Sequence, residues 1–356
     1  MKRDLLRKII LHHRCRHIVK AESPYLKSLK FEQLTKTEWS EVKDFWGRLN
    51  LPINPFYFQM FKTLANYDCR YCPDDLFFPY ILRALNRYEY SIAYAHKGML
   101  PRIFANSKVR IPHTIINCIN GVIYDGEGKK INKNLIKDIL EKEQEFIIKP
   151  TTDTCKGRGV RKISTPADYD SVLKLYGNNF IIQEAVKQSS LTAVFNKPSL
   201  NTFRITTLYI NGKATPCTIL FKCGQGDVCI DNGGGGGIMI GVDDNGNLSE
   251  YGYNKEYKRI YKTINGLAFK GYTFPPIRRI ANLFCELHEE LIPHLGLAGW
   301  DVAIDEQQNP VLIEANLSAP GVQFEQLCPQ TPIFGDRTSE VIEYVAKQKH
   351  IQLIKI

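Results

Sequence analysis

Apolar residues follow two different spacings along the chain, and the change falls near residue 100. Between residues 26 and 46 they recur at roughly helical intervals, which predicts helix. A second helix is predicted near Leu76–Tyr88, with Asp74 and Asp75 as candidate caps. Residues 1–95 are therefore predicted to form a mainly helical N-terminal domain.

Beyond residue 100, short apolar runs bounded by turn residues replace the helical spacing. Helices are predicted over Asn132–Glu145, Asp168–Leu175 and Pro276–Ile292. Helices and strands mix without strict alternation, which predicts α+β lobes with antiparallel sheet. The predicted strands are residues 114–119, Phe146–Lys149, Phe180–Gln183, Phe203–Ile210, Thr215–Lys222, Ala298–Ile304 and Pro310–Glu314.

Composition limits the class of protein. The chain has 356 residues, of which 44% are hydrophobic and 24% charged, which is typical of a globular protein with two or three domains. No apolar run is long enough to predict a spanning helix, and the basic N-terminus lacks a signal-peptide core, so we expect a cytoplasmic protein. The Cys69–Cys72 pair has no partner pair at zinc-finger spacing, which favours free thiols over a metal site.

The net charge of +10 is partly concentrated at the N-terminus. Residues 1–20 carry seven Lys or Arg against the single acid Asp4, with apolar residues interleaved, which predicts a basic amphipathic helix. Such a helix can contact an anionic membrane surface, or it can pack on its own domain with a solvated basic face. The second interpretation is favoured. No other feature points to nucleic acid as a partner.

The strongest chemical signal is the C-terminal β-hairpin. Asp301 lies on its first strand, and Glu314 and Asn316 lie on its second. Because side chains at i and i+2 share a face of a strand, Glu314 and Asn316 project together, and the hairpin can bring Asp301 beside them. Three oxygen donors on an otherwise apolar sheet suit Mg²⁺. The alternative is that Glu314 and Asn316 face solvent.

Three further segments have the composition of phosphate-binding elements. Lys149 ends a predicted strand and precedes a loop with Gly157 and Gly159, where backbone N–H groups can approach a phosphate. Arg204 follows Asn201-Thr-Phe and offers a fork of donors for phosphate or carboxylate, although a surface ion pair is its common alternative. The five glycines after Asp231-Asn232 predict a loop near a ligand rather than a plain linker.

In this order, the four segments resemble the ATP-grasp superfamily, and most closely its sugar-transfer-associated members, which are related to α-L-glutamate ligases. The resemblance covers roughly residues 90–325, and the hairpin is also similar to that of D-alanine–D-alanine ligases. It implies an ATP-grasp fold, in which two α+β lobes clasp ATP. Residues 96–187 would form the lid lobe, and residues 188–350 the catalytic lobe with the magnesium-binding hairpin.

The resemblance also implies roles for individual residues. Arg204 and Lys149 match catalytic positions, and Asp301, Glu314 and Asn316 match the magnesium ligands. Glu184, in the predicted adenine-binding hinge, could reach the ribose. The positions that match nucleotide-binding residues are Lys97, Lys149, Gly157, Gly159, Gln183, Glu184, Val186, Lys222, Asp231 and Asn232.

The implied activity is ATP-dependent ligation of a carboxylate to an amine through an acyl phosphate. The substrates would be small molecules, such as an amino acid or a glycan precursor, and the chemistry would need ATP and Mg²⁺ but no enzyme nucleophile. A small-molecule kinase on the same scaffold is one alternative. Others are a nucleotide-binding scaffold in polysaccharide assembly and a membrane-surface adaptor acting through residues 1–20. The sequence names neither substrate.

Overall fold

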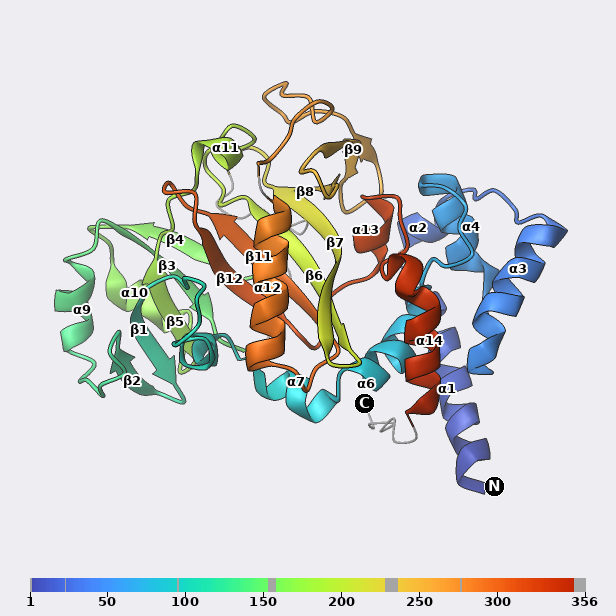
Figure 1. Ribbon diagram of the computed structural model, residues 1–356. Coiled ribbons are helices and arrows are strands. Elements are labelled where there is room, and N and C mark those ends of the chain that lie inside the picture. Colours follow the sequence, from blue (N-terminus) through green and yellow to red (C-terminus); the bar gives the residue numbers. More distant parts are fainter. Residues whose placement is uncertain are drawn as a thin grey trace.

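The computed structural model describes residues 2–22, 24–94, 96–152, 158–227, 236–275 and 277–348 (Figure 1). A group of helices from the N-terminal region lies at one side of a large central sheet, and a smaller lobe lies at the other side (Figure 1). Both sheets are antiparallel throughout. The α+β prediction is therefore confirmed.

The N-terminal region is helical, as predicted. Helix α3 opens on a capping box in which Thr35 accepts from the Glu38 backbone and Glu38 reaches back to the Thr35 N–H. Pro55 stands at the first turn of α4, where its missing N–H costs nothing. The elements are α1 (Lys2–Ala21), α2 (Pro24–Ser28), α3 (Lys36–Trp46), η1 (Gly47–Leu49), α4 (Pro55–Leu64), α5 (Asp74–Leu76), η2 (Phe77–Ile81), α6 (Leu82–Leu85), α7 (Tyr88–Tyr94), η3 (Lys97–Met99) and α8 (Leu100–Ile103).

The predicted helix near Leu76–Tyr88 needs correction. The segment is a short α-turn, a π-helical turn and a second α-turn, and it ends at Asn86 rather than at Tyr88. The prediction that Asp74 and Asp75 cap this helix is also wrong. Both lie in the first turn with buried side chains, and the N-cap residue is Pro73, which has no side chain able to cap.

The lid lobe has a hydrophobic core of its own. Its five strands are ordered β2-β1-β5-β3-β4, and α9 (Leu135–Leu140) and α10 (Tyr169–Lys174) pack on one face of that sheet. Helix α9 is shorter than the predicted Asn132–Glu145 because the chain turns after Leu140 and Glu145 already belongs to a strand. The strands are β1 (Thr114–Ile119), β2 (Val122–Asp125), β3 (Glu145–Pro150), β4 (Arg161–Ser164) and β5 (Phe180–Glu184).

The central sheet has seven strands, ordered β10-β9-β8-β7-β6-β11-β12. Its strands are β6 (Thr202–Ile210), β7 (Lys213–Cys223), β8 (Ile238–Val242), β9 (Leu248–Tyr253), β10 (Arg259–Ile260), β11 (Leu297–Ile304) and β12 (Pro310–Asn316). The remaining helices are α11 (Ser190–Ala193), α12 (Ile277–Leu291), α13 (Gln323–Leu327), η5 (Gly335–Arg337) and α14 (Thr338–Lys347). The predicted pairing of β6 with β7 and of β11 with β12 is confirmed.

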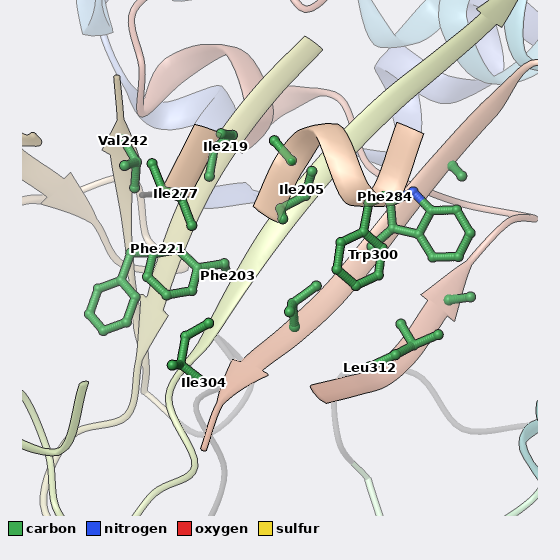
Figure 2. Close-up of a cluster of buried hydrophobic side chains, with 14 of the residues drawn as sticks. Phe203, Ile205, Ile219, Phe221, Val242, Ile277, Phe284, Trp300, Ile304 and Leu312 are labelled. Atoms are coloured by element: carbon green, nitrogen blue, oxygen red, sulfur yellow. The ribbon is translucent and has the colours of Figure 1, made fainter. Parts of the chain in front are cut away.

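The two faces of this sheet differ in chemistry because successive side chains of a strand alternate between them. Helix α12 covers one face, and Figure 2 shows Phe284 and Ile277 of this helix beside Phe203, Phe221 and Trp300 of the strands. These side chains form the largest apolar cluster. The intervening residues therefore project from the opposite face, where the predicted chemistry is found.

The N-terminal helices do not form a separate core. Trp46, Phe58 and Phe77 belong to one apolar cluster with Leu208 and Leu297 of the central sheet. Residues of α14 complete this cluster. The hydrophobic core therefore continues across the predicted boundary at residue 95, from the N-terminal helices into the central sheet.

The basic N-terminal segment is helical. Leu11 and Cys15 of α1 are buried, and they pack in the cluster shared with Trp46 and Phe77. This contact agrees with the favoured interpretation, a helix packed on its own domain. Among the described residues, no helix combines the length and the apolar character needed to cross a membrane. Cys69 and Cys72 form no disulfide.

Candidate active site

Four neighbouring strands bring the predicted catalytic-lobe residues onto one face of the central sheet. Arg204 of β6 stands opposite Asp301 of β11, and Asp301 stands opposite Glu314 of β12. Lys222 of β7 stands opposite Thr202, two residues before Arg204 and on the same face as it. The apolar residues between them face α12, so the alternation of the strands itself separates the core from this polar surface.

Asp301 is the centre of a hydrogen-bonded group. Its carboxylate accepts two bonds from the Arg204 guanidinium, Nε at 2.7 Å and Nη2 at 2.9 Å. The Lys222 ammonium lies 3.0 Å from Oδ1, and the Asn316 amide donates to Oδ2 at 3.2 Å. The parallel two-bond geometry is the strongest form of arginine–carboxylate pairing and fixes both side chains.

The charges of this group determine which side chains are ionised. Burial alone would raise the pKa of the Asp301 carboxyl, but Arg204 and Lys222 outweigh that effect and hold its pKa well below the usual value. Burial alone would lower the pKa of the Arg204 guanidinium. The charges of Asp301 and Glu325 outweigh this effect and hold its pKa above the ordinary value. Asp301 is therefore a carboxylate, and Arg204 a cation, at any physiological pH.

Two lysines from outside the central sheet meet Glu314. The Lys97 ammonium lies 3.0 Å from Glu314 Oε1. Lys97 belongs to η3, which is attached to the lid lobe because its N–H donates to the Thr151 carbonyl. The pKa of Lys149 responds to the charges of both Glu314 and Lys97, so these three groups are close neighbours. The cations of one lobe therefore meet an anion of the other.

Lys149 is a buried lysine at the end of β3. Burial lowers the pKa of its ammonium to about 8, the charge of Lys97 acts in the same direction, and the charge of Glu314 opposes both. The ammonium thus remains mostly protonated at neutral pH. The protonated ammonium can bind an anion, and a bound anion would raise the pKa of Lys149 because it stabilises the charged form.

The predicted hinge residues lie at the end of β5. Gln183 is buried and donates to the Pro112 carbonyl at 3.1 Å, and Val186 is half-buried just beyond the strand. Glu184 Oε1 accepts from the Arg110 guanidinium at 2.5 Å and from the His113 N–H at 2.8 Å. The predicted reach of Glu184 to a ribose therefore competes with two hydrogen bonds to its own chain.

The lid loop lies between β3 and β4, and only part of it is described. Gly159 has a φ of +78°, and a Cβ there would stand 2.9 Å from the Pro150 ring, so only glycine fits without strain. Its carbonyl accepts from the Tyr176 hydroxyl at 2.8 Å. Gly157, Asp231 and Asn232, which the resemblance assigned to nucleotide binding, lie outside the described residues.

The predicted magnesium ligands lie close together on one face of the hairpin, as a Mg²⁺ site requires. Asp301 and Glu314 are directly opposed on the hairpin, and Asn316 follows on the same face and contacts Asp301. Within the described residues, no three His, Cys, Asp or Glu side chains are close enough to hold an ion by themselves. The predicted site has two carboxylates and one amide, which suits Mg²⁺ because this ion takes few carboxylates and completes its shell with water and phosphate.

One residue of this group was not predicted. Glu325 of α13 is buried and lies 3.5 Å from Arg204 Nη1, and the Pro320 carbonyl accepts from the same nitrogen at 2.9 Å. Gly321 has a φ of +91°, and a Cβ there would stand 2.2 Å from the Glu325 carboxylate. A glycine four residues before an acid is a common sequence pattern, so only the folded chain identifies this pair.

Comparisons with known proteins give one family match and several distant structural similarities. Residues 171–341 match the model of a family described as sugar-transfer associated ATP-grasp. No curated protein sequence matches the chain. Among solved structures, the ATP-grasp ligase PsnB, solved with a minimal precursor, Mg and ADP, is 12% identical with a TM-score of 0.41 over 72% of this chain and 61% of PsnB.

Two further structures are similarly distant. The L-amino acid ligase from Bacillus licheniformis is 13% identical with a TM-score of 0.42, over 85% of this chain and 52% of the ligase. The D-alanine–D-alanine ligase from Coxiella burnetii is 7% identical with a TM-score of 0.41, over 72% and 57% of the two chains. This chain thus spans between about half and three-fifths of the length of the structures that it resembles.

Two α+β lobes whose charged residues face one another define the class: this is a protein of the ATP-grasp superfamily. Within that superfamily, residues 171–341 match the sugar-transfer associated ATP-grasp family. The resemblance predicted from the sequence is therefore confirmed.

Proposed function

We propose that this chain is an ATP-dependent carboxylate–amine ligase that forms an amide through an acyl phosphate. One observation carries the proposal: cations of the lid lobe and cations of the central sheet meet the same short row of acids. Lys97 and Lys149 come from one side, and Arg204 and Lys222 come from the other. Four cations facing three oxygen donors suit a polyphosphate bound with a divalent ion.

In this proposal each described side chain has a task. Lys97 and Lys149 bind the phosphate oxygens and hold ATP between the lobes. Asp301, Glu314 and Asn316 hold Mg²⁺, which when bound offsets the charge on the phosphate groups. Arg204, held rigidly by Asp301, steadies the acyl phosphate as it forms. The predicted hinge of Gln183, Glu184 and Val186 places the base of the nucleotide.

The family description supports a substrate connected with sugar transfer, and an amino acid or a glycan precursor is consistent with it. A cytoplasmic location would supply ATP. A small-molecule kinase on the same fold remains the alternative outcome, since it would use the same phosphate-binding residues and make no amide.

Trapping with hydroxylamine tests the proposal directly. The enzyme, ATP and Mg²⁺ are incubated with paired amino acids, amino sugars and glycan precursors, and products are read by mass spectrometry. A ligase yields a hydroxamate from its carboxylate substrate, because hydroxylamine captures the acyl phosphate. A phosphorylated hydroxyl with no hydroxamate from any carboxylate would establish the kinase instead.

Glu314→Gln tests the metal ligands in the same assay. Removing one of only two carboxylates should lower turnover by a factor of about 100 or more. Glu306→Gln is the matched control, since Glu306 is exposed in the turn of the same hairpin. Robust phosphate release by Glu314→Gln would contradict the assignment of Asp301, Glu314 and Asn316 as the metal site.

A further inference from the structure

The short segment that carries Lys97 lies on one face of the lid sheet. Asn117 of β1 stands opposite Ile181 of β5, and Ile181 stands opposite Lys149 of β3. Directly opposed residues of neighbouring strands project from the same face of a sheet, so Asn117 and Lys149 share a face. We call this the inner face. The apolar core formed with α9 and α10 lies against the opposite face.

Two hydrogen bonds fasten η3 to the inner face. The Asn117 side chain donates from Nδ2 to the Gly98 carbonyl at 2.7 Å. The Lys97 N–H donates at 3.0 Å to the carbonyl of Thr151, which directly follows β3. The two bonds hold polar groups on either side of the peptide bond that joins Lys97 to Gly98. The backbone of Lys97 is therefore attached both to β1 and to the end of β3.

Gly98 allows this close attachment. A Cβ at this position would stand 2.8 Å from Asn117 Oδ1, 3.0 Å from the His96 ring and 3.1 Å from the Thr151 methyl group. Such short approaches are rare in a packed interior, so any other residue would displace its neighbours. The Asn117 amide is the nearest of the three groups, and it is the one that a methyl group at this position would push aside.

Asn117 is buried, yet its amide is only half used. The residue is 5% exposed, and its Oδ1 receives no hydrogen bond from any described residue. The opposite orientation of the amide would bring Oδ1 against the Gly98 carbonyl, so two acceptors would meet. A buried acceptor without a partner costs free energy that a leucine of similar size would not incur. The bond to Gly98 is therefore what asparagine contributes at this position.

The attachment of η3 determines where the Lys97 side chain can reach. Lys149 lies two residues before Thr151 and is buried on the inner face. Because Lys97 is bonded to Thr151, both lysines move with the same lobe. The Lys97 ammonium lies 3.0 Å from Glu314 of the other lobe. Exchange of Glu314 for a phosphate group then needs only a rotation of the Lys97 side chain, while its backbone stays in place.

We propose that Asn117 is a positioning residue that fixes Lys97 beside Lys149, so that the lid lobe presents two lysines already in place for the phosphates of ATP. Gly98 supplies the room that this arrangement needs. The inference rests on the proposed function, in which both lysines bind phosphate. Asn117 touches no ligand in it and acts through Lys97. Cations that are held in position before the ligand arrives bind an anion without the entropic cost of ordering them.

A double-mutant cycle in the full-length protein tests this role. The probe is AMPPNP, a non-hydrolysable analogue of ATP, with Mg²⁺, and calorimetry gives its dissociation constant without turnover. Lys97→Met and Asn117→Leu should each weaken AMPPNP binding by about tenfold. The variant that combines Asn117→Leu with Lys97→Met should bind AMPPNP no more weakly than Lys97→Met alone, because no lysine is left to position.

Gly98→Ala tests the same contact from its other side. The added methyl group must displace the Asn117 amide, which then loses its bond to the Gly98 carbonyl. Gly98→Ala should therefore weaken AMPPNP binding by about tenfold when Lys97 is present, and should have no further effect when combined with Lys97→Met. This second variant keeps the inference testable if Asn117→Leu folds poorly.

Cys118→Ala is the matched control. Cys118 is the next residue of β1, and it is buried in the lid core on the face away from η3. Its substitution alters the packing of the lobe, but AMPPNP binding should equal that of the wild type. Equal losses from Asn117→Leu with and without Lys97→Met would show a purely structural role and overturn the inference. Wild-type affinity in both Asn117→Leu and Gly98→Ala would overturn it as well.

Hydroxylamine separates this inference from the proposed function. If the chain makes no hydroxamate from any carboxylate but the cycle gives the expected result, the ligase assignment fails and the positioning role stands. If hydroxamate forms and neither Asn117→Leu nor Gly98→Ala changes AMPPNP affinity, the ligase stands and the positioning role is refuted. Equal AMPPNP affinity in the wild type and Lys97→Met, or no binding by the wild type, would also refute it, because Lys97 would then hold no phosphate.

Discussion

Buried carboxylates in this protein have opposite properties, and their neighbours decide which. Asp301 is surrounded by Arg204, Lys222 and an amide, so its pKa falls although the residue is buried. Asp75 is equally buried but has no cationic neighbour among the described residues, so its pKa rises to about 7. The first arrangement stores a fixed negative charge. The second creates a group that titrates at neutral pH.

The pKa of Asp75 predicts how stability depends on pH. Because its folded-state pKa of about 7 exceeds the value of about 3.9 in an unfolded chain, the folded protein keeps a proton that the unfolded chain loses. The stabilising contribution is complete below about pH 4 and is lost as pH rises toward 7, by up to roughly 4 kcal/mol. Asp75→Asn should abolish this part of the loss.

Urea denaturation at about pH 5 and about pH 8 measures the effect, through the difference in free energy of unfolding between the two pH values. Asp75→Asn should show a smaller difference than the wild type. Asp44→Asn, at an exposed position of α3, serves as the control and should behave as the wild type does. If Asp75→Asn and the wild type lose the same free energy, Asp75 is not the titrating group.

Elements of this fold are joined by single buried polar side chains. Asn86, at the end of α6, donates to the Leu297 and Leu317 carbonyls, both at 2.7 Å. Its Oδ1 accepts from the Gly296 N–H at 3.0 Å and from the Leu297 N–H at 2.8 Å. This side chain therefore fastens the N-terminal region to the beginning of β11, the strand that carries Asp301.

Asn86→Ala should destabilise the fold by about 2–4 kcal/mol, because four hydrogen bonds to backbone groups in a buried position are lost. Chemical denaturation gives the value. The control is Asn134→Ala, since Asn134 is exposed and its side chain makes no capping bond to α9. If Asn86→Ala lowers the free energy of unfolding no more than Asn134→Ala does, water replaces these hydrogen bonds without destabilising the fold.

The whole molecule consists of one lobe with its own core and two regions that share a core. The lid lobe encloses an apolar cluster composed entirely of its own residues. In contrast, Trp46, Phe58 and Phe77 of the N-terminal region cover Leu208 and Leu297 of the central sheet. Movement of the small lobe relative to the rest is therefore compatible with this architecture, whereas the N-terminal helices share a core with the central sheet.

Two deletions should differ in outcome for this reason. A chain beginning at residue 96 should aggregate, because the apolar end of the central sheet becomes exposed. A chain in which a flexible linker replaces residues 114–184 should remain soluble and cooperatively folded, because it loses a lobe with a separate core. Gel filtration and thermal unfolding distinguish the two. A soluble, cooperative chain beginning at residue 96 would show that the shared core is dispensable.

Local sequence patterns were sufficient for much of this architecture. The strands of the hairpin and the pair β6–β7 were predicted because alternation of side chains and turn residues such as Asn211-Gly212 act over a few positions. The helix at Leu76–Tyr88 was predicted too long, because the chain leaves the helix at Asn86, whose buried side chain bonds to backbone groups more than 200 positions away in the chain. The polar candidates Asp301, Glu314 and Arg204 were recognised because each interrupts an apolar strand.

The amino-acid sequence by itself predicted seven of the strands, the resemblance to the ATP-grasp family and the polar residues of the central sheet, since these follow from short-range periodicity and from motifs of a few residues. Only the tertiary structure decided that Lys97 reaches Glu314 across the lobes, that Glu325 joins Arg204, and that the side chains of Asp74 and Asp75 are buried. Burial and charge pairing depend on every element that packs around a side chain, and no local pattern records them.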